Sequence, residues 1–282
     1  MRCVGVRKPA CNTHNRYFVA LKIMFHDVAH FHQVRVRLAS GDVTAGFSRG
    51  SSRKKCAQQT LFGEKMLPLK KGVVGDECVY SFYDIGSFVS GKEPIPERLR
   101  VRLPADELRE TSLVVDAAER TRRLVAKAIL RGNLANILDV EPSSLVFGRG
   151  PTGKPFLSTQ RFQWLRFNLS HSGDFVATAT GRTELGIDIE RHRLVSDAGD
   201  LMHRYFCEDE HQLFLGTDVS SQMETFFSLW TRKEALLKAM GTGFSRLLDS
   251  VSVVRDDVIE GSWRVCSIVA PIGYSAAISW HL

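Results

Sequence analysis

The sequence feature that most restricts the fold is the segment LGIDIE (185–190), in which aliphatic and polar residues alternate. A period of two predicts a β-strand whose aliphatic side chains share one face, while Asp188 and Glu190 share the other, roughly 7 Å apart. Like charges that close repel unless a cation lies between them, so removing one carboxylate is expected to stabilise the metal-free protein. Mg²⁺ is the natural cation, because it takes one or two carboxylates and completes its octahedron with waters and phosphate oxygens. The alternative is an ordinary strand face exposed to solvent.

The neighbouring segments predict a mixture of helices and short strands. Phe175–Thr180 is predicted to be a strand that a Gly-Arg-Thr turn joins to Glu184–Glu190, which makes a β-hairpin. Amphipathic helices are expected from about Asp116 to Leu138 and from about Gln222 to Met240. Helices interleaved with short, turn-connected strands favour an α+β fold.

Arg122 lies on the apolar side of the first of these helices. It precedes Val125 by three residues and Ile129 by seven, whereas the neighbouring basic residues form a separate stripe that solvent can hydrate. A guanidinium on an apolar face needs a buried or half-buried anion as its partner. We therefore expect an anion beside Arg122.

Two further segments carry groups suited to binding ions. Glu234 and Lys238 are four residues apart, so they are neighbours on the second helix. They form either a surface ion pair, or a third carboxylate for the metal beside a cation for the same phosphate. The segment NLSHSG (168–173) adds two hydroxyls, an imidazole and backbone N–H groups, which suit an anion site but also occur in common turns.

Two other kinds of site are suggested by spacing alone. GRGPTGK (148–154) begins like a phosphate-binding loop, but Pro155 replaces the hydroxyl that such a loop needs, and the following residues do not favour a helix. Possible zinc ligands recur in two clusters without a convincing fourth member, so packed or solvated side chains are the favoured interpretation. These residues are His203, Cys207 and His211, and His26, His30 and His32.

The charge and the cysteines restrict the partners and the compartment. Residues 1–75 hold 14 Lys and Arg against 3 Asp and Glu, so the net charge of +7 leaves about −4 (7 − 11) for the rest of the chain. This argues against a nucleic-acid partner for the main body. The six cysteines are scattered, as in a cytoplasmic protein, although the Arg-rich start keeps a mitochondrial transit peptide open. No apolar run is long enough to span a membrane, and we expect a monomer.

Three segments together resemble the signature blocks of the 4′-phosphopantetheinyl transferases. They are FNLSHSG (167–173), GIDIE (186–190) and WTRKEALLKAMGTGF (230–244). The similarity is to the larger single-chain type that activates peptide and polyketide synthetases, and it covers about residues 76–282. GKP (153–155), the helix from Arg122 to Arg131 and RYFCEDE (204–210) also resemble that family.

This resemblance implies an α+β fold built as a pseudo-twofold pair of similar halves, here 76–166 and 167–282, with coenzyme A in the cleft between them. It implies the activity of a holo-[acyl-carrier-protein] synthase. Such an enzyme transfers 4′-phosphopantetheine from coenzyme A to a serine of an apo acyl or peptidyl carrier protein, with Mg²⁺, and releases adenosine 3′,5′-bisphosphate. A catalytically inactive relative that only binds carrier proteins is the alternative.

The resemblance also assigns roles to residues. It implies that Asp188, Glu190 and Glu234 ligate Mg²⁺ and that Lys238 neutralises the pyrophosphate of coenzyme A. Glu234 or a metal-bound water would take the proton of the serine. It also implies that Arg122 and His171 contact the 3′-phosphate of coenzyme A. Lys154 and Ser170 are implied to line the pocket for the adenine and the phosphates.

The sequence departs from the family in two places. Just before the Arg122 helix, ELRETSLVV lacks the usual basic residues and leaves Arg109 as the candidate there. Residues 1–75 match no part of the family. We expect them to be a poorly ordered basic extension that can be deleted. This extension could be a targeting segment, a partner-binding segment or the product of a start codon placed too far upstream.

Overall fold

The computed structural model describes residues 68–75, 78–242, 248–255, 258–259 and 261–282, which all belong to one compact unit. The basic segment before residue 68, with His26, His30 and His32, lies outside the described residues. The strands are β1 (Lys70–Val74), β2 (Cys78–Asp84), β3 (Phe147–Arg149), β4 (Pro155–Leu157), β5 (Arg166–Ser172), β6 (Phe175–Gly181), β7 (Leu185–Arg191), β8 (Val258–Ile259), β9 (Trp263–Ser267) and β10 (Tyr274–His281). The α-helices are α2 (Gly86–Val89), α3 (Glu97–Arg100), α4 (Ala105–Ser112), α5 (Ala117–Leu138), α6 (Ala198–Tyr205), α7 (Glu208–Leu215) and α8 (Gln222–Met240).

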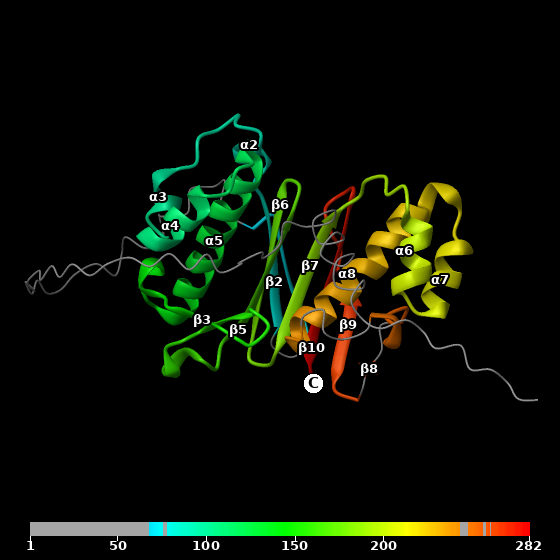
Figure 1. Cartoon of the computed structure of the whole chain (residues 1–282). Coiled ribbons are helices and arrows are strands. Elements are labelled where there is room, and N and C mark those ends of the chain that lie inside the picture. The colour runs from blue at the N-terminus through cyan, green and yellow to red at the C-terminus, as the bar shows by residue number, and fades with distance from the viewer. Residues whose placement is uncertain (1–67, 76–77, 243–247, 256–257, 260) are drawn as a thin grey trace, which may run out of the picture. The chain divides into compact units, whose positions relative to one another are not determined.

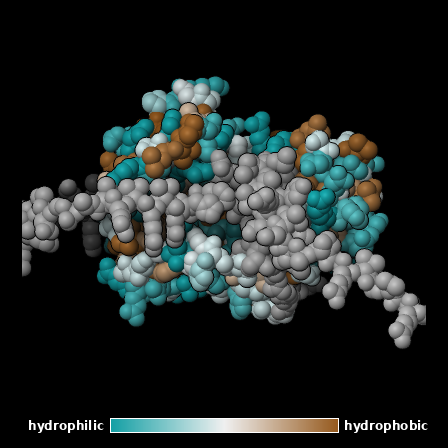
Figure 2. Space-filling view, viewed as in Figure 1, coloured by the Kyte–Doolittle hydropathy of each residue, from teal (hydrophilic) through white to brown (hydrophobic). Residues whose placement is uncertain are grey.

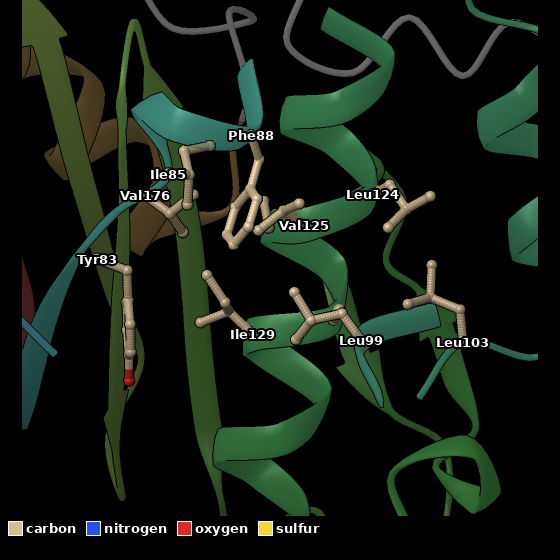
Figure 3. Close-up of a cluster of buried hydrophobic side chains, with 11 residues drawn as sticks. Tyr83, Ile85, Phe88, Leu99, Leu103, Leu124, Val125, Ile129 and Val176 are labelled. Atoms are coloured by element: carbon tan, nitrogen blue, oxygen red, sulfur yellow. The ribbon is translucent and has the colours of Figure 1, made fainter. Parts of the chain in front are cut away.

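The first sheet has the order β1-β2-β6-β5, and every pairing in it is antiparallel. The long helix α5 packs beside it (Figure 1). Asp116 begins this helix, because its carboxylate accepts a hydrogen bond from the Glu119 N–H at 2.6 Å. Val125 and Ile129 of α5 point toward Phe88 and Val176 in the core between helix and sheet (Figure 3). This core fixes α5, and therefore Arg122, against the end of the sheet that carries the β5–β6 turn.

The second sheet has the order β7-β10-β9-β8 and is also antiparallel. Helix α8 lies on it, with α6 and α7 packed beside α8 (Figure 1). Gly186 permits this contact, because a Cβ atom there would lie 2.2 Å from the carbonyl oxygen of Ala235. Helix α8 ends at Gly241, which has the left-handed conformation (φ 64°). The close approach of α8 to β7 brings Lys238 over the strand that carries Asp188.

The predicted α+β class is confirmed. Each half is a four-stranded antiparallel sheet with one long helix against it, which is the repeated arrangement expected of a pseudo-twofold pair. The third, small sheet is the β3-β4 hairpin.

The predicted hairpin between 175–180 and 184–190 is wrong, although both strands exist. Strand β6 pairs with β2 and β5, whereas β7 pairs with β10, so the chain passes from one sheet to the other between them. A short turn between two alternating segments favours a hairpin locally, but the long-range partners β2 and β10 replace that pairing. Strand β7 is therefore an edge strand that faces β5, the edge of the first sheet.

The same strand pairings place the boundary between the halves at a different position from the one expected. Strands β5 and β6 complete the first sheet, so the passage between halves falls at 182–184 instead of after 166. Strand β1 lies inside the segment expected to be an extension, yet it pairs with β2 along its whole length. Its residues KKGVV are too short and too polar to show a buried period, and only pairing identifies them as a strand.

The surface of the described residues is mixed. On the face shown in Figure 2, hydrophobic residues gather in separate groups over the region of α2–α4 and over α6 and α7, among hydrophilic ones. Among the residues described, no helix has both the length and the apolar character needed to cross a bilayer.

Candidate functional site

Asp188 and Glu190 project from β7 into the interior and not into solvent, because both side chains are 0% exposed. A solvated strand face is therefore excluded. Oδ1 of Asp188 accepts two hydrogen bonds, one from Oγ of Ser170 at 2.8 Å and one from Nζ of Lys238 at 2.6 Å. Lys238 also donates to Ser170 Oγ at 3.2 Å and to the carbonyl of Ile187 at 3.3 Å. The two halves of the protein meet in this contact, since Ser170 lies on β5 and Lys238 on α8.

Three carboxylates surround the ammonium group of Lys238 and stabilise its positive charge. Burial alone would lower the pKa of its ammonium group, but the charges of Asp188, Glu234 and Glu190 and the hydrogen bond to Asp188 outweigh burial and raise it. Lys238 is thus the cation between the carboxylates in the metal-free protein. This contact argues against the expectation that removing one carboxylate would stabilise that state, because removal would leave Lys238 without its nearest counter-charge.

Glu190 is held separately from Asp188. Its Oε2 accepts a hydrogen bond from Oγ of Ser172 at 2.9 Å, and Nη1 of Arg193 lies 4.0 Å from the same oxygen. Glu234, one turn before Lys238 on α8, adds a carboxylate whose charge acts on Lys238. The sequence prediction that these acidic residues and Lys238 share one neighbourhood thus agrees with the packing of α8 on β7.

The donor set fits a hard cation. Within the described part of the chain, Oδ2 of Asp188 is buried and has no hydrogen-bond partner. A buried carboxylate oxygen without a partner is costly unless a cation or a hydrogen-bond donor binds it. The described residues contain no group of three or more acidic, His or Cys side chains placed closely enough to hold a metal by themselves. Mg²⁺ commonly uses only one or two protein carboxylates together with phosphate oxygens, so an incomplete protein shell is compatible with it.

Arg122 and His171 lie together around an acidic residue that the sequence analysis did not identify. Glu119 is buried, and its Oε2 lies 3.4 Å from Nη1 of Arg122, while its Oε1 lies 2.8 Å from Nε of Arg123 and 4.0 Å from Nε2 of His171. Nε of Arg122 donates to the carbonyl of Gly173 at 2.9 Å. The anion expected beside Arg122 is therefore present within the protein as Glu119, one turn earlier on α5.

Lys154 lies apart from that cluster. Its ammonium group donates to Oε2 of Glu184 at 2.7 Å, to the carbonyl of Leu185 at 3.1 Å and to the carbonyl of Ala239 at 3.0 Å. Burial lowers its pKa, although the hydrogen bond and charge of Glu184 oppose that shift. These contacts connect the β3-β4 hairpin to the start of β7 and to the end of α8.

The other suggested sites have ordinary structural explanations. GRGPTGK (148–154) lies in the β3-β4 hairpin, so it lacks the helix that a phosphate-binding loop requires. His203 and His211 contact each other with ring centroids 5.4 Å apart, while Sγ of Cys207 donates to the carbonyl of Asp249 at 3.2 Å. In the described residues these side chains do not form a metal-binding group.

Sequence reasoning also missed a buried ion pair that supports the site. Nζ of Lys233 lies 2.8 Å from Oε2 of Glu210, and both side chains are almost completely buried. The pair fixes α8 to α7 five residues before Lys238. Lys233 and Glu234 are neighbours in the sequence, but Lys233 faces α7 and Glu234 lies on the side of α8 that carries Lys238.

Comparisons with known proteins agree with this geometry. Residues 184–279 match the 4′-phosphopantetheinyl transferase superfamily, and residues 97–183 match the N-terminal region of 4′-phosphopantetheinyl transferases. The boundary between the two matches falls where the chain passes from the first sheet to the second.

Individual relatives carry the same name. The chain is 37% identical to the 4′-phosphopantetheinyl transferase HetI of Nostoc sp. over 53% of its own length and 64% of that protein. It is 32% identical to Sfp of Bacillus subtilis over 47% of its length and 57% of that protein, so these two alignments span less than two thirds of the relative. It is 30% identical to the putative 4′-phosphopantetheinyl transferase slr0495 of Synechocystis sp. over 66% of its length and 82% of that protein. The chain therefore belongs to the 4′-phosphopantetheinyl transferase superfamily of enzymes, in its larger single-chain type.

Proposed function

We propose that this protein transfers the 4′-phosphopantetheine group of coenzyme A to a serine of an apo acyl or peptidyl carrier protein, in a Mg²⁺-dependent reaction that releases adenosine 3′,5′-bisphosphate. The observation that carries the proposal is the contact of Lys238 with Asp188 at the junction of the two halves, with Glu190 and Glu234 around it. Buried carboxylates beside a lysine suit a substrate that brings phosphate and a divalent cation together.

The donor set of Asp188, Glu190 and Glu234 would hold the Mg²⁺. The buried Oδ2 of Asp188, which has no hydrogen-bond partner among the described residues, supports this assignment. When bound, Mg²⁺ would offset the negative charge that develops on the pyrophosphate.

The protein's own residues would then act on the two ends of the reaction. The serine oxygen attacks the β-phosphorus of coenzyme A, and the bond from that phosphorus to the bridging oxygen breaks, which releases adenosine 3′,5′-bisphosphate. Lys238 stays charged at neutral pH despite its burial, because the surrounding carboxylates raise its pKa, and it would stabilise the charge on the departing phosphate. Glu234, one helical turn away, would accept the serine proton.

The remaining residues would bind the nucleotide end. Arg122 and His171, which meet around Glu119, are proposed to contact the 3′-phosphate. Ser170, hydrogen-bonded to both Asp188 and Lys238, would lie between that cluster and the pyrophosphate. Lys154 would border the pocket from the β3-β4 hairpin.

The experiment is mass spectrometry of candidate apo carrier proteins after incubation with the enzyme, Mg²⁺ and coenzyme A. The expected result is a gain equal to one phosphopantetheine on a serine, which disappears with a chelator. Binding of carrier proteins without any mass gain would instead identify a catalytically inactive relative.

A further inference from the structure

The edges of the two sheets meet through side chains. Strand β5 ends the first sheet and β7 begins the second, and the two strands pack side by side. Three polar side chains on alternate positions of β5 point toward β7, as the period of a strand requires. All three are buried, and they are Asn168, Ser170 and Ser172.

Two of these side chains replace the missing backbone partners of an edge strand. Oδ1 of Asn168 accepts a hydrogen bond from the N–H of Ile187 at 2.9 Å. Oγ of Ser172 accepts one from the N–H of Arg191 at 3.1 Å. A buried N–H group without a partner is costly, so these bonds fix the position of β7 against β5.

Ser172 does more than satisfy the backbone. Its hydroxyl accepts from Arg191 N–H and donates to Oε2 of Glu190 at 2.9 Å, so both of its hydrogen-bonding functions are engaged at once. Because the acceptor side is fixed by the main chain of β7, the direction in which the hydroxyl donates is fixed as well. The carboxylate of Glu190 is thereby oriented by a group that belongs to the other sheet.

We propose that Ser172 is a positioning residue for the cation site: its hydroxyl orients the Glu190 carboxylate for a divalent cation across the junction between the sheets. This inference rests on the proposed function only in taking Glu190 as a cation ligand. Ser170 is engaged differently, because it contacts Asp188 and Lys238 directly. Outer partners of this kind commonly change metal affinity by tenfold to a hundredfold when they are lost.

The test is the binding of Mn²⁺, as a paramagnetic substitute for Mg²⁺, to the full chain in the presence of coenzyme A, followed by electron paramagnetic resonance. Ser172→Ala is expected to weaken Mn²⁺ binding about tenfold, and to raise the Mg²⁺ concentration for half-maximal transfer in parallel. Ser172→Thr, which keeps the hydroxyl, is expected to restore both values to nearly those of the wild type.

Ser279→Ala is the matched control. Ser279 is a fully buried serine on β10 that pairs with Gly186, and its hydroxyl donates to the carbonyl of Arg264 at 2.7 Å instead of to a carboxylate. It should lower the melting temperature without changing Mn²⁺ affinity. If Ser172→Ala does not fold, Ser172→Cys, which fills the volume with a weaker donor, takes its place with the same expected loss of affinity.

The outcomes separate the two proposals. Wild-type Mn²⁺ affinity in Ser172→Ala, or in Ser172→Cys, would overturn the positioning role while wild-type transfer still supports the proposed function. A loss of affinity that Ser279→Ala reproduces would also overturn it, because any buried serine would then do the same. A wild-type protein that neither binds Mn²⁺ nor transfers phosphopantetheine would overturn both proposals.

Discussion

Nζ of Lys238 lies 2.6 Å from Oδ1 of Asp188, and this contact joins α8 to β7 at the point where the two sheets meet. Asp188 is fully buried and Lys238 is 17% exposed, so in the metal-free protein the lysine supplies the positive charge that the carboxylates require. Any cation that binds the Asp188 carboxylate must therefore lie beside the Lys238 ammonium group. The first two predictions follow from this relationship.

Asp188→Ala should nearly abolish transfer and should also destabilise the metal-free protein. Removing the carboxylate leaves the Lys238 ammonium without its nearest counter-charge and Ser170 without its acceptor, at a cost of about 3 kcal/mol. Carrier modification across a Mg²⁺ titration and the melting temperature without metal would measure the two effects. Turnover like that of the wild type at low millimolar Mg²⁺ would refute the proposed mechanism, and an unchanged melting temperature would refute the role of the ion pair.

Lys238→Ala should slow transfer by about a hundredfold to a thousandfold, if the ammonium acts mainly on charge in the transition state. Because its folded pKa is raised, its stabilising effect is full below the ordinary lysine pKa of 10.5 and is lost as pH rises through the higher folded value. The wild type should therefore lose this contribution only in alkaline solution. Lys127→Ala, which removes an exposed pair with Glu110, is the control and should leave both rate and alkaline stability nearly unchanged.

Arg122→Ala should weaken coenzyme A by about tenfold to a hundredfold, and 3′-dephospho-coenzyme A much less. The reason is the loss of a charged donor that Glu119 and the Gly173 carbonyl hold in place. Calorimetry with both ligands measures the difference, with Arg120→Ala as the control, since Arg120 lies on the same helix and donates to the Val114 carbonyl. Equal weakening of both ligands would remove the 3′-phosphate assignment.

Deleting residues 1–67 should leave a folded and active transferase, whereas deleting residues 1–75 should lower its melting temperature. The longer deletion removes β1, which pairs with β2 over five residues and covers the ring of Tyr80 with Gly72. It also exposes the edge of β2, which favours aggregation. Differential scanning calorimetry of the two truncations would test this, and identical melting curves would show that β1 contributes nothing to stability.

Cys207 should react slowly with iodoacetamide at neutral pH. Burial raises the pKa of its thiol from 9.0 to about 11, and the charge of Lys233 only partly offsets that effect. Two pKa units correspond to about a hundredfold less thiolate than in the unfolded chain. Stability that depends on the protonated thiol is present below pH 9 and is lost as pH rises toward 11. Peptide-resolved mass spectrometry of alkylation, with denatured protein as reference, should show this difference, and equal rates would contradict it.

Much of the local structure could be predicted from the sequence because it depends on short-range spacing. The alternation in 185–190 places Asp188 and Glu190 on one face of β7, and the four-residue spacing places Glu234 beside Lys238 on α8. The signature blocks identified the family, which the comparisons then confirmed. These positions of side chains on a strand face or a helix face do not depend on which other strands the strand pairs with.

The partners of those residues could not be predicted, because they come from other parts of the chain. Glu119 is an exception, because it lies three residues before Arg122 on α5 and is within reach of helical spacing. His171 is not, because only the packing of β5 beside α5 brings its ring to the same carboxylate. The hairpin assignment failed for a similar reason, because β2 and β10 offer longer antiparallel pairings than the turn between β6 and β7 can impose.

The sequence by itself determined which residue types lie on which face of each strand and helix, because that depends on covalent geometry alone. Only the tertiary structure decided that β5 and β7 are facing edges, that Ser172 bridges Glu190 and the backbone of β7, and that Lys238 neutralises Asp188. Burial makes these pairings necessary, since an ionised or hydrogen-bonding group removed from water must find a partner in space, however distant that partner is along the chain.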